Sequence, residues 1–256
     1  GFAYDKAYQR HYQLEHFNVP VRTATSKERR EPFGRIRRFL IKKWNAAFTF
    51  AEKYYLCQDG VDFDRRLLEK KVSRDTFIEG YWQSERYFAD IEDTIRSDLQ
   101  IESPNDPQNI SVAIRIRDCN AVAVHVRFFD LPETASVSNL SDDYYHCAVL
   151  EMEKQVPDAH YFVFSDMPEK ARVKIPLDDE RVTFVHHNRG DEHAYADLWL
   201  MTNCKHFIIA NSTFSWWGAW LSNNVNKVVI APGFEIREGK MWWGFDGLLP
   251  ADWIKM

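Results

Sequence analysis

The C-terminal half of the chain alternates short apolar runs with amphipathic segments. The apolar runs, rich in Val, Ile, Ala and Phe, occupy residues 121–127, 161–164, 182–185, 207–210 and 227–230. The segments between them have helical spacing and occupy residues 142–153, 168–172, 193–203 and 212–221. Continuous apolar strands that alternate with helices are typical of a parallel sheet covered on both faces. We therefore predict a doubly wound α/β domain from about residue 110 onward.

The first 110 residues have a different pattern. Helical spacing dominates there, with one aromatic stretch at residues 77–88. Residues 102–109, ESPNDPQN, combine two prolines with Ser, Asn and Asp, which is a loop composition. We place a domain boundary in this loop and predict two domains, at residues 1–110 and 111–256.

Composition and charge narrow the function classes. The chain has 256 residues, a net charge of −5 and 45% hydrophobic residues. This balance fits a globular chain and excludes a bulk nucleic-acid-binding surface, which needs a basic face. The four cysteines are scattered without a CxxC motif, a pattern typical of a reduced cytoplasmic protein. One segment, residues 27–43, is rich in Lys and Arg; it is either the solvated face of a helix or a contact for a membrane surface or an anionic acceptor.

Polar side chains gather where the predicted strands end. Ligands of open α/β sheets bind beyond the carboxyl ends of the strands. His125 and Arg127 lie on one face of the first strand, because successive side chains alternate. The polar residues after the later strands include Ser165, Asp166, His186, His187, Asn188, Asn211, Ser212 and Thr213.

The run Asn211-Ser212-Thr213 leads from a strand into a helix. Free backbone N–H groups, hydroxyls and the positive end of the helix dipole make such a turn suitable for a phosphate. The alternative is that Ser212 or Thr213 only caps the helix. Arg127 favours the phosphate site, because a guanidinium can grip a phosphate bidentately. No Gly-rich fingerprint of dehydrogenases or P-loop kinases accompanies it.

Several motifs resemble those of the bacterial α-1,2-fucosyltransferases. Residues 196–221, ADLWLMTNCKHFIIANSTFSWWGAWL, carry the strongest similarity, above all through the block FSWWGA. Residues 161–168 resemble the F-S-D block of that family, residues 80–88 its G-Y-x-Q-S-E-x-Y-F segment, and residues 252–255 its C-terminus. His125, Arg127 and Asp130 resemble its H-x-R-R-x-D signature, and the similarity covers about residues 77–256.

Two departures from the family pattern stand out. Phe128 occupies the position of the second Arg of the signature, so one cationic contact is missing. The opening strand and Gly-rich turn usual in such chains have no match here. We therefore expect the natural chain to begin upstream of Gly1.

The resemblance implies a GT-B fold of two Rossmann-like α/β domains. Residues 1–110 would be the acceptor-side domain, without its first strand, and residues 111–256 would bind the donor nucleotide. The implied reaction moves L-fucose from GDP-β-L-fucose, with inversion, to O2 of a terminal galactoside. The implied acceptor is a galactose-containing oligosaccharide or a lipid-linked glycan. No metal and no cofactor besides the donor substrate are implied, and the location would be the cytoplasm, at the inner face of the membrane.

The resemblance also implies roles for single residues. His125 and Asp197 would contact guanine, and Arg127 would hold the β-phosphate and stabilise the departing GDP. Asp166 and Asn211 would belong to the same donor site, with Ser212, Thr213 and Ser215 along the pyrophosphate. The general base would be Asp130, with Glu85 or Glu133 as the alternatives. Acceptor contacts are expected from Tyr81, Trp82, Gln83 and Glu85.

Other signals have plainer interpretations. Asp62 and Asp64 form a D-x-D, a metal–nucleotide motif of another glycosyltransferase fold, but the arrangement also suits a helix cap. Trp216 and Trp217 are adjacent and point about 100° apart on a helix, so at least one of them should pack against the sheet. Two other functions stay open: transfer from a different nucleotide-sugar, and a non-catalytic nucleotide- or glycan-binding module, which Phe128 and the missing opening motif favour.

Overall fold

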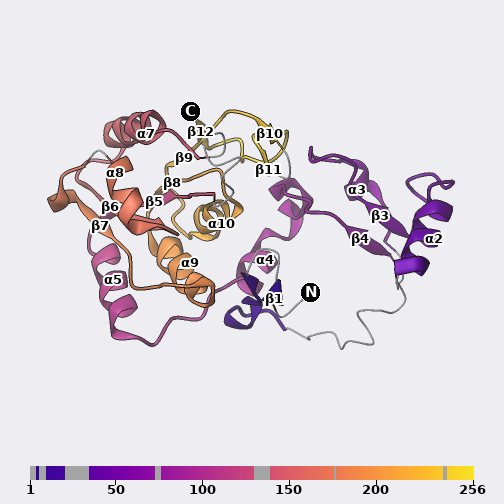
Figure 1. The fold of residues 1–256 in the computed structure, drawn as a ribbon, viewed down its shortest axis with the longest axis horizontal. Coiled ribbons are helices and arrows are strands. Elements are labelled where there is room, and N and C mark those ends of the chain that lie inside the picture. The colour runs from indigo at the N-terminus through magenta and orange to yellow at the C-terminus, as the bar shows by residue number, and fades with distance from the viewer. Residues whose placement is uncertain are drawn as a thin grey trace.

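A computed structural model describes residues 4–5, 10–20, 35–72, 76–129, 139–175, 177–238 and 241–256. Its centre is a six-stranded sheet in the order β12-β9-β8-β5-β6-β7, in which every neighbouring pair is parallel (Figure 1). The strands are β5 (Asn120–Val126), β6 (Ala159–Ser165), β7 (Val182–Phe184), β8 (His206–Ile208), β9 (Val229–Ala231) and β12 (Ile254–Lys255). The predicted parallel α/β sheet is confirmed.

Helices cover both faces of this sheet. The helices are α5 (Pro107–Arg117), α7 (Asp142–Gln155), α8 (Pro168–Lys174), α9 (Ala194–Asn203) and α10 (Thr213–Leu221). Strand β5 shows the reason for the two layers, because its residues alternate between two cores. Ala121 and Ala123 pack with α5, α9 and α10 on one face, and Val122 and Val124 pack with α7 on the other. Residues 121–124 of β5 face apolar cores on both sides, which is why this part of the strand is a continuous apolar run.

The tryptophans of α10 belong to the packing. Trp216 is buried, and its indole Nε1 donates a hydrogen bond to the carbonyl of Leu248 at 2.8 Å. Trp217 stacks on Phe88, with the ring centroids 5.8 Å apart. The prediction that at least one of the pair packs is confirmed, and here both do.

The N-terminal part is smaller and contains a separate parallel pair, β3 (Tyr55–Cys57) and β4 (Phe77–Glu79). Helices α2 (Arg35–Asn45) and α3 (Arg66–Glu69) accompany it, and Figure 1 shows this unit beside the main sheet, with α2 at the outer end. Two strands are fewer than a Rossmann-like sheet requires, within the residues that the structure describes. The two-domain GT-B arrangement therefore stays a prediction.

Short elements connect and flank these units. They are β1 (Tyr4–Asp5), β2 (Arg10–His11), α4 (Glu92–Asp98), β10 (Ile236–Glu238) and β11 (Met241–Trp243). Strands β1 and β2 form one antiparallel pair and β10 and β11 another. The end of the predicted linker is helical, because Pro107 begins α5 and the Asp106 carboxylate caps it by accepting from the N–H of Asn109 at 2.9 Å.

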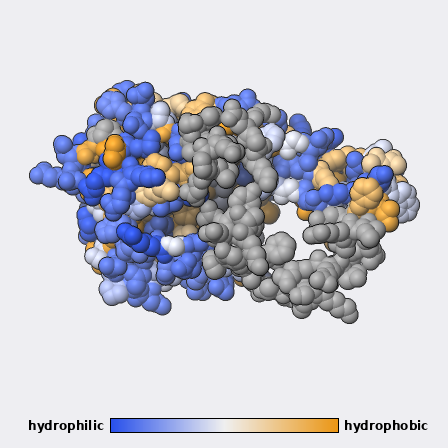
Figure 2. All heavy atoms as spheres, viewed as in Figure 1, coloured by the Kyte–Doolittle hydropathy of each residue, from blue (hydrophilic) through white to orange (hydrophobic). Residues whose placement is uncertain are grey.

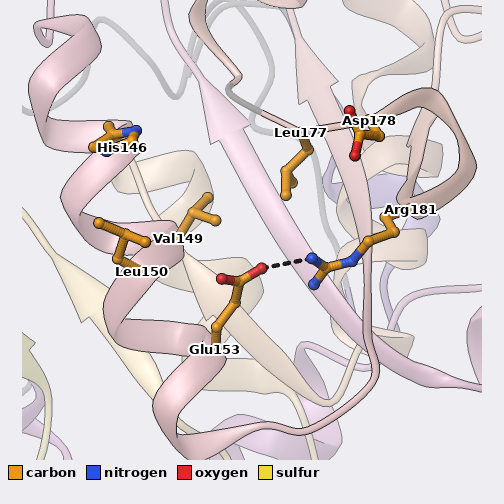
Figure 3. Close-up of a pocket in the computed structure, with 7 residues that line it drawn as sticks. All are labelled: His146, Val149, Leu150, Glu153, Leu177, Asp178 and Arg181. Atoms are coloured by element: carbon orange, nitrogen blue, oxygen red, sulfur yellow. Dashed lines mark ion pairs between the residues drawn. The ribbon is translucent and has the colours of Figure 1, made fainter.

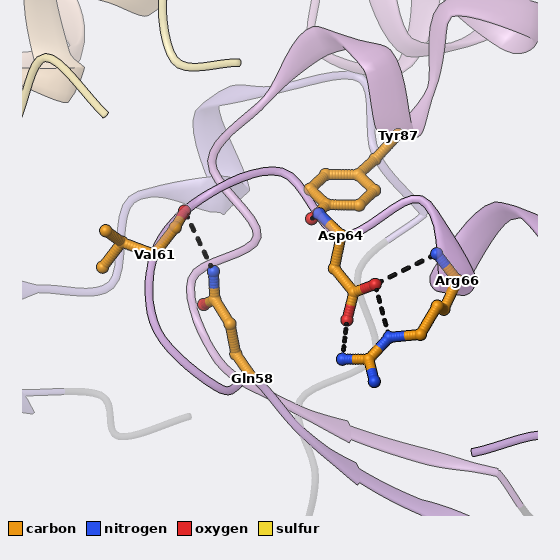
Figure 4. A network of polar contacts seen from close by, with 5 residues as sticks. All are labelled: Gln58, Val61, Asp64, Arg66 and Tyr87. Carbon is orange, nitrogen blue, oxygen red and sulfur yellow. Dashed lines mark hydrogen bonds and ion pairs between the residues drawn. The ribbon is translucent and has the colours of Figure 1, made fainter. Parts of the chain in front are cut away.

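The D-x-D residues hold loops and a helix start in place, and Figure 4 shows the contacts of Asp64. Asp64 accepts from the backbone N–H of Arg66 at 3.0 Å and pairs with its guanidinium, with Oδ2 and Nη2 2.7 Å apart. Asp62 accepts from the backbone N–H of Asp246 at 3.1 Å. The N-cap residue of α3 is Arg65, so Asp64 supports the helix start from one position further back, and both carboxylates are engaged by the chain itself.

Two further findings concern the chain as a whole. None of the helices within the described residues is long and apolar enough to cross a membrane. All four cysteines are free thiols, with Cys204 buried and Cys57 and Cys147 exposed.

Candidate active site

Arg127 and Asp166 meet at the carboxyl edge of the sheet. They directly follow the paired strands β5 and β6, whose ladder ends at Val126 and Ser165. Arg127 Nη1 lies 2.6 Å from Asp166 Oδ2, and the other carboxylate oxygen accepts from the backbone N–H of Phe128 at 3.0 Å. On the other side of β5, the segment after β8 leads through Asn211 into α10, whose second residue, Phe214, lies beside His125 of β5. Two polar residues predicted for the donor site, Arg127 and Asp166, are thus in direct contact at this edge.

His125 lies one layer deeper, on the same face of β5 as Arg127. Its side chain is buried, and its ring lies 5.5 Å from that of Phe214, the second residue of α10. Burial, together with the charge of Arg127, lowers the pKa of His125 to about 3, so the ring is neutral at pH 7. Nδ1 is buried and has no hydrogen-bond partner among the described residues. An unpaired buried nitrogen is costly, so Nδ1 of His125 is available for a polar partner beyond the described residues.

The start of α10 only partly matches the prediction. Ser212 is the N-cap residue, but in the described structure its side chain makes no capping hydrogen bond, and Thr213 is exposed. Ser215 is fully buried, and its hydroxyl donates to the carbonyl of Ser212 at 3.1 Å. Ser212 and Thr213 are thus placed to meet a ligand at the helix N-terminus. The position of Ser215 does not support the predicted contact, because its hydroxyl is occupied inside the helix.

Asp197 lies in the first turn of α9 and is held by a chain of amides. Asn188 Nδ2 donates to Asp197 Oδ1 at 2.8 Å, and Asn109 Nδ2 donates to Asn188 Oδ1 at 2.8 Å. Asn109 also bonds Asp106 at 2.7 Å, and its Oδ1 lies 3.0 Å from His187 Nε2. Burial raises the pKa of Asp197 to about 7, and the bond from Asn188 acts against that rise.

Sequence reasoning missed the part of this network that Asn109 provides. Asn109 is 2% exposed, yet it lies in the segment whose composition predicted a loop. Asn188 was visible as a polar residue after a strand, but nothing in its spacing showed a partner 79 residues away. A buried amide between an N-cap aspartate and a helix is recognisable only once the fold is known.

Glu85 does not join this group. Its carboxylate accepts from Trp220 Nε1 at 3.0 Å. Trp220 lies seven residues beyond Thr213 on α10, which is ~10 Å along the helix axis from its N-terminus. Burial raises the pKa of Glu85. The structure therefore places Glu85 beside the far end of α10 and away from Arg127.

Asp130 and Glu133 lie outside the described residues. Of the predicted acceptor contacts, Tyr81 is exposed, and Trp82 has a positive φ of 49°, unusual for a bulky side chain. Gln58 Oε1 fixes this turn by accepting from the N–H groups of Tyr81 and Trp82 at 2.8 and 3.1 Å. The turn follows β4 in the N-terminal part.

A pocket of about 240 Å³ lies elsewhere (Figure 3). It lies between α7 and the segment before β7, and the ion pair of Glu153 with Arg181, 2.7 Å long, crosses it. Glu153 is near the end of α7 and Arg181 precedes β7, so the pocket lies toward the amino edge of the sheet. It is separate from the cluster around Arg127.

Within the described ranges, no three His, Cys, Asp or Glu side chains come together in a way that could hold a metal ion. The charge available to a phosphate in this cluster comes from Arg127 and the α10 N-terminus.

A family model described as glycosyl transferase family 11 matches residues 38–237. This range includes both the Arg127–Asp166 cluster and the start of α10. The chain belongs to glycosyl transferase family 11. The bacterial glycosyltransferase resemblance inferred from the motifs is thereby confirmed.

Two relatives of this family 11 chain come from Escherichia coli. The chain is 34% identical over 187 residues to an alpha-1,2-colitosyltransferase, and the match covers 69% of this chain and 61% of that protein. It is 28% identical over 239 residues to the O-antigen biosynthesis glycosyltransferase WbnK, covering 88% of this chain and 78% of WbnK. This chain thus spans less than two thirds of the colitosyltransferase.

Solved structures give weaker similarity. NodZ alpha-1,6-fucosyltransferase soaked with GDP-fucose aligns with a TM-score of 0.37 and 17% identity, over 60% of this chain and 55% of that one. Fucosyltransferase NodZ from Bradyrhizobium aligns with a TM-score of 0.38 and 15% identity, over 71% and 63%.

Proposed function

We propose that this family 11 transferase moves L-fucose from GDP-β-L-fucose to a glycan hydroxyl, O2 of a terminal galactoside, with inversion. The observation that carries the proposal is the pairing of Arg127 with Asp166 at the carboxyl edge of the sheet, where the segment after β8 leads through Asn211 into α10. A diphosphate placed there would meet a guanidinium, the N–H groups of the helix N-terminus and the hydroxyl side chains of Ser212 and Thr213. The proposed sugar and linkage rest on the motifs that resemble those of bacterial α-1,2-fucosyltransferases.

The reaction requires stabilisation of the leaving diphosphate. The acceptor oxygen attacks C1 of the sugar, the bond from C1 to the phosphate oxygen breaks, and GDP leaves with that electron pair. Negative charge therefore grows on the β-phosphate in the transition state. Preorganised donors aimed at such charge stabilise the transition state more than the ground state. Arg127 performs this role, and Asp166 keeps its guanidinium in position.

The proton of the acceptor hydroxyl goes to a general base. We assign this role to Asp130, because it follows Arg127 by three residues and lies in the segment after β5. If Asp130 is the base, Asp130→Asn should lower the rate of transfer by about 10³-fold or more, and the variant should still bind GDP. Loss of GDP binding in the same variant would instead make Asp130 a donor contact.

Asp197 and His125 suit the guanine base. An ionised carboxylate accepts from both N1–H and the 2-amino group of guanine, which no other common nucleobase presents together. The amide chain from Asn109 through Asn188 fixes one oxygen of Asp197 and leaves the other for the base. His125, neutral and with an Nδ1 unpaired among the described residues, is a second candidate for a polar contact to the base.

Colitose is a second candidate sugar, because the relative with 34% identity is named an alpha-1,2-colitosyltransferase. The residues around Arg127 contact the diphosphate in either case, so they do not choose between the sugars. A third candidate, a binding module without turnover, rests on Phe128 in place of the second Arg of the signature.

One experiment separates these candidates. The purified protein is incubated with GDP-fucose, or with a nucleotide-activated colitose, and a β-galactoside, and the products are identified by mass and linkage analysis. We expect fucose on O2 of galactose, and GDP as the second product. Colitose transfer alone would establish the second candidate, and GDP binding by calorimetry without turnover on any acceptor would establish the third.

A further inference from the structure

Helix α2 leaves a row of large apolar side chains in the solvent. Phe39, Leu40 and Trp44 are 58%, 59% and 68% exposed. Positions 40 and 44 are one turn apart, and Phe48, three residues beyond the end of α2, lies with its ring 5.9 Å from that of Trp44. We call these four side chains the α2 apolar face. Figure 2 shows orange, apolar atoms gathered at the right-hand end of the molecule, where Figure 1 draws α2.

The other side of α2 is already packed. Asn45 is buried, and its side chain bonds both backbone groups of Tyr55, donating to the carbonyl at 2.5 Å and accepting from the N–H at 3.4 Å. Lys42 pairs with Glu79 of β4 at 2.7 Å. These contacts fix the helix on the β3–β4 pair, so the α2 apolar face cannot turn inward without breaking them.

Positive charge is concentrated on the same part of the chain. Helix α2, RIRRFLIKKWN, contains five Lys and Arg and no Asp or Glu, whereas the chain as a whole carries a net charge of −5. Helix α2 has no acidic residue in its first turn and two lysines in its last. The ammonium of Lys43 lies 4.9 Å from the centre of the Phe39 ring, so charge and apolar surface adjoin.

We propose that α2 docks this protein onto a lipid surface with anionic headgroups. Large apolar side chains enter the boundary of the acyl chains, while neighbouring Lys and Arg side chains contact the headgroup phosphates. A second copy of the chain fits less well, because it would bring two faces of the same positive charge together. The helix lies along the surface, since it has 11 residues and about 20 are needed to span a bilayer.

This inference is independent of the sugar that is transferred. It uses residues of the N-terminal part, and none of them belongs to the cluster around Arg127. Docking at a bilayer would deliver the enzyme to lipid-linked acceptors, yet it can be measured without donor or acceptor. Its failure and a failure of the proposed function are therefore distinguishable.

The test is flotation of the whole protein with lipid vesicles. We expect binding to vesicles with 30% phosphatidylglycerol, weak binding to pure phosphatidylcholine, and a decrease at high salt. Phe39→Ser with Trp44→Ser should lower the partition coefficient about tenfold or more. Trp44→Phe should keep the binding and reduce the quenching of tryptophan fluorescence by brominated lipids.

The matched control carries Val173→Ser and Val225→Ser, two residues 82% and 92% exposed on other elements. It should bind vesicles like the unchanged protein, and circular dichroism should show that both double variants are folded. Three results would overturn the proposal: no vesicle binding, equal binding by the Phe39/Trp44 variant, or a dimer in light scattering that this variant dissociates. The last result would assign the α2 apolar face to a second copy of the chain.

Discussion

The guanidinium of Arg127 and the carboxylate of Asp166 lie 2.6 Å apart, and the second carboxylate oxygen is held by the N–H of Phe128. Asp166 therefore fixes the head of Arg127 from one side. A guanidinium has five N–H donors, so the pair leaves others for a phosphate. The acidic residue, predicted as a donor contact, thus acts in this geometry by positioning Arg127.

Replacing Arg127 should abolish most of the transfer. Arg127→Ala removes the donor aimed at the β-phosphate, and the loss of one such donor costs about 10²–10³ in kcat. Arg127→Lys should recover only part of it, because an ammonium lacks the planar fork that reaches both Asp166 and a phosphate. Initial rates of fucose transfer measure both variants. Wild-type rates in Arg127→Ala would contradict the mechanism.

Asp166→Asn tests the positioning role. Asparagine still accepts from the N–H of Phe128 but no longer pairs electrostatically with Arg127. We expect about a tenfold loss in kcat, and almost no further loss when the change is added to Arg127→Ala, because Asp166 acts through that side chain. Independent, additive losses would show that Asp166 contacts the substrate itself.

Nucleotide binding should release a proton from Asp197. Its pKa of about 7 leaves a proton on much of the free protein at pH 6, and guanine requires the ionised carboxylate. GDP affinity should therefore rise from pH 5.5 to about 7 and then level off. Calorimetry in two buffers of different ionisation enthalpy measures the released proton. Asp197→Asn should lose this pH dependence and bind GDP about 10–100-fold more weakly than the wild type. For inosine diphosphate, which lacks the 2-amino group, the difference in affinity between the variant and the wild type should be smaller.

The same group affects folding stability, with a definite sign. Asp197 has its pKa raised from 3.8 to about 7, so between these values the folded protein holds a proton that the unfolded chain has lost. The free energy that this retained proton adds to folding is fully present below pH 3.8 and is lost as the pH rises through 7. Relative to Asp197→Asn, the wild type should lose on the order of 2–3 kcal/mol between pH 5 and 8. Urea unfolding at each pH measures it, and parallel curves for the two proteins would contradict the raised pKa.

Much of the fold was predictable because the strands of the main sheet are buried on both faces. Their sequences are continuous apolar runs, and β5 lacks any polar residue between Ala121 and Val124. Strand β12 and the β10–β11 pair, each of two or three residues, were not predicted. So few residues show no periodicity, and their positions depend on contacts with distant segments.

The site was predictable only where strand ends determine it. Arg127, Asp166 and Asn211 follow from the rule that ligands of α/β sheets lie beyond the carboxyl ends. Ser215 and Glu85 were chosen by motif, and motif position does not show where a side chain points. Ser215 faces the core because the helix turns it inward. Glu85 contacts Trp220, which lies 135 residues further along the sequence.

Transfer should not need a divalent metal. Family resemblance implies this, and the positive charge at the proposed diphosphate site comes from Arg127 and the α10 N-terminus. We expect initial rates within about twofold of the untreated protein after incubation with EDTA and gel filtration. Added Mg²⁺ or Mn²⁺ should not raise the initial rate of the EDTA-treated protein. A loss that Mn²⁺ reverses would point to a cation at the diphosphate.

Glu85 offers the sharpest contrast between motif and position. Its carboxylate lies near the far end of α10 and accepts from Trp220 Nε1 at 3.0 Å. Glu85→Gln keeps an oxygen for that indole and removes only the charge, so kcat should stay within about threefold of wild type. Glu85→Ala leaves the buried indole N–H unpaired and should lower the free energy of unfolding by ~1–3 kcal/mol.

Asp130→Asn is the matched comparison, with a loss in kcat of about 10³-fold or more if Asp130 is the base. A loss of about 10²-fold or more in kcat for Glu85→Gln, with unchanged stability and GDP affinity, would make Glu85 the general base. The N-terminal part and the main sheet would then have to close on each other to bring Glu85 to the sugar.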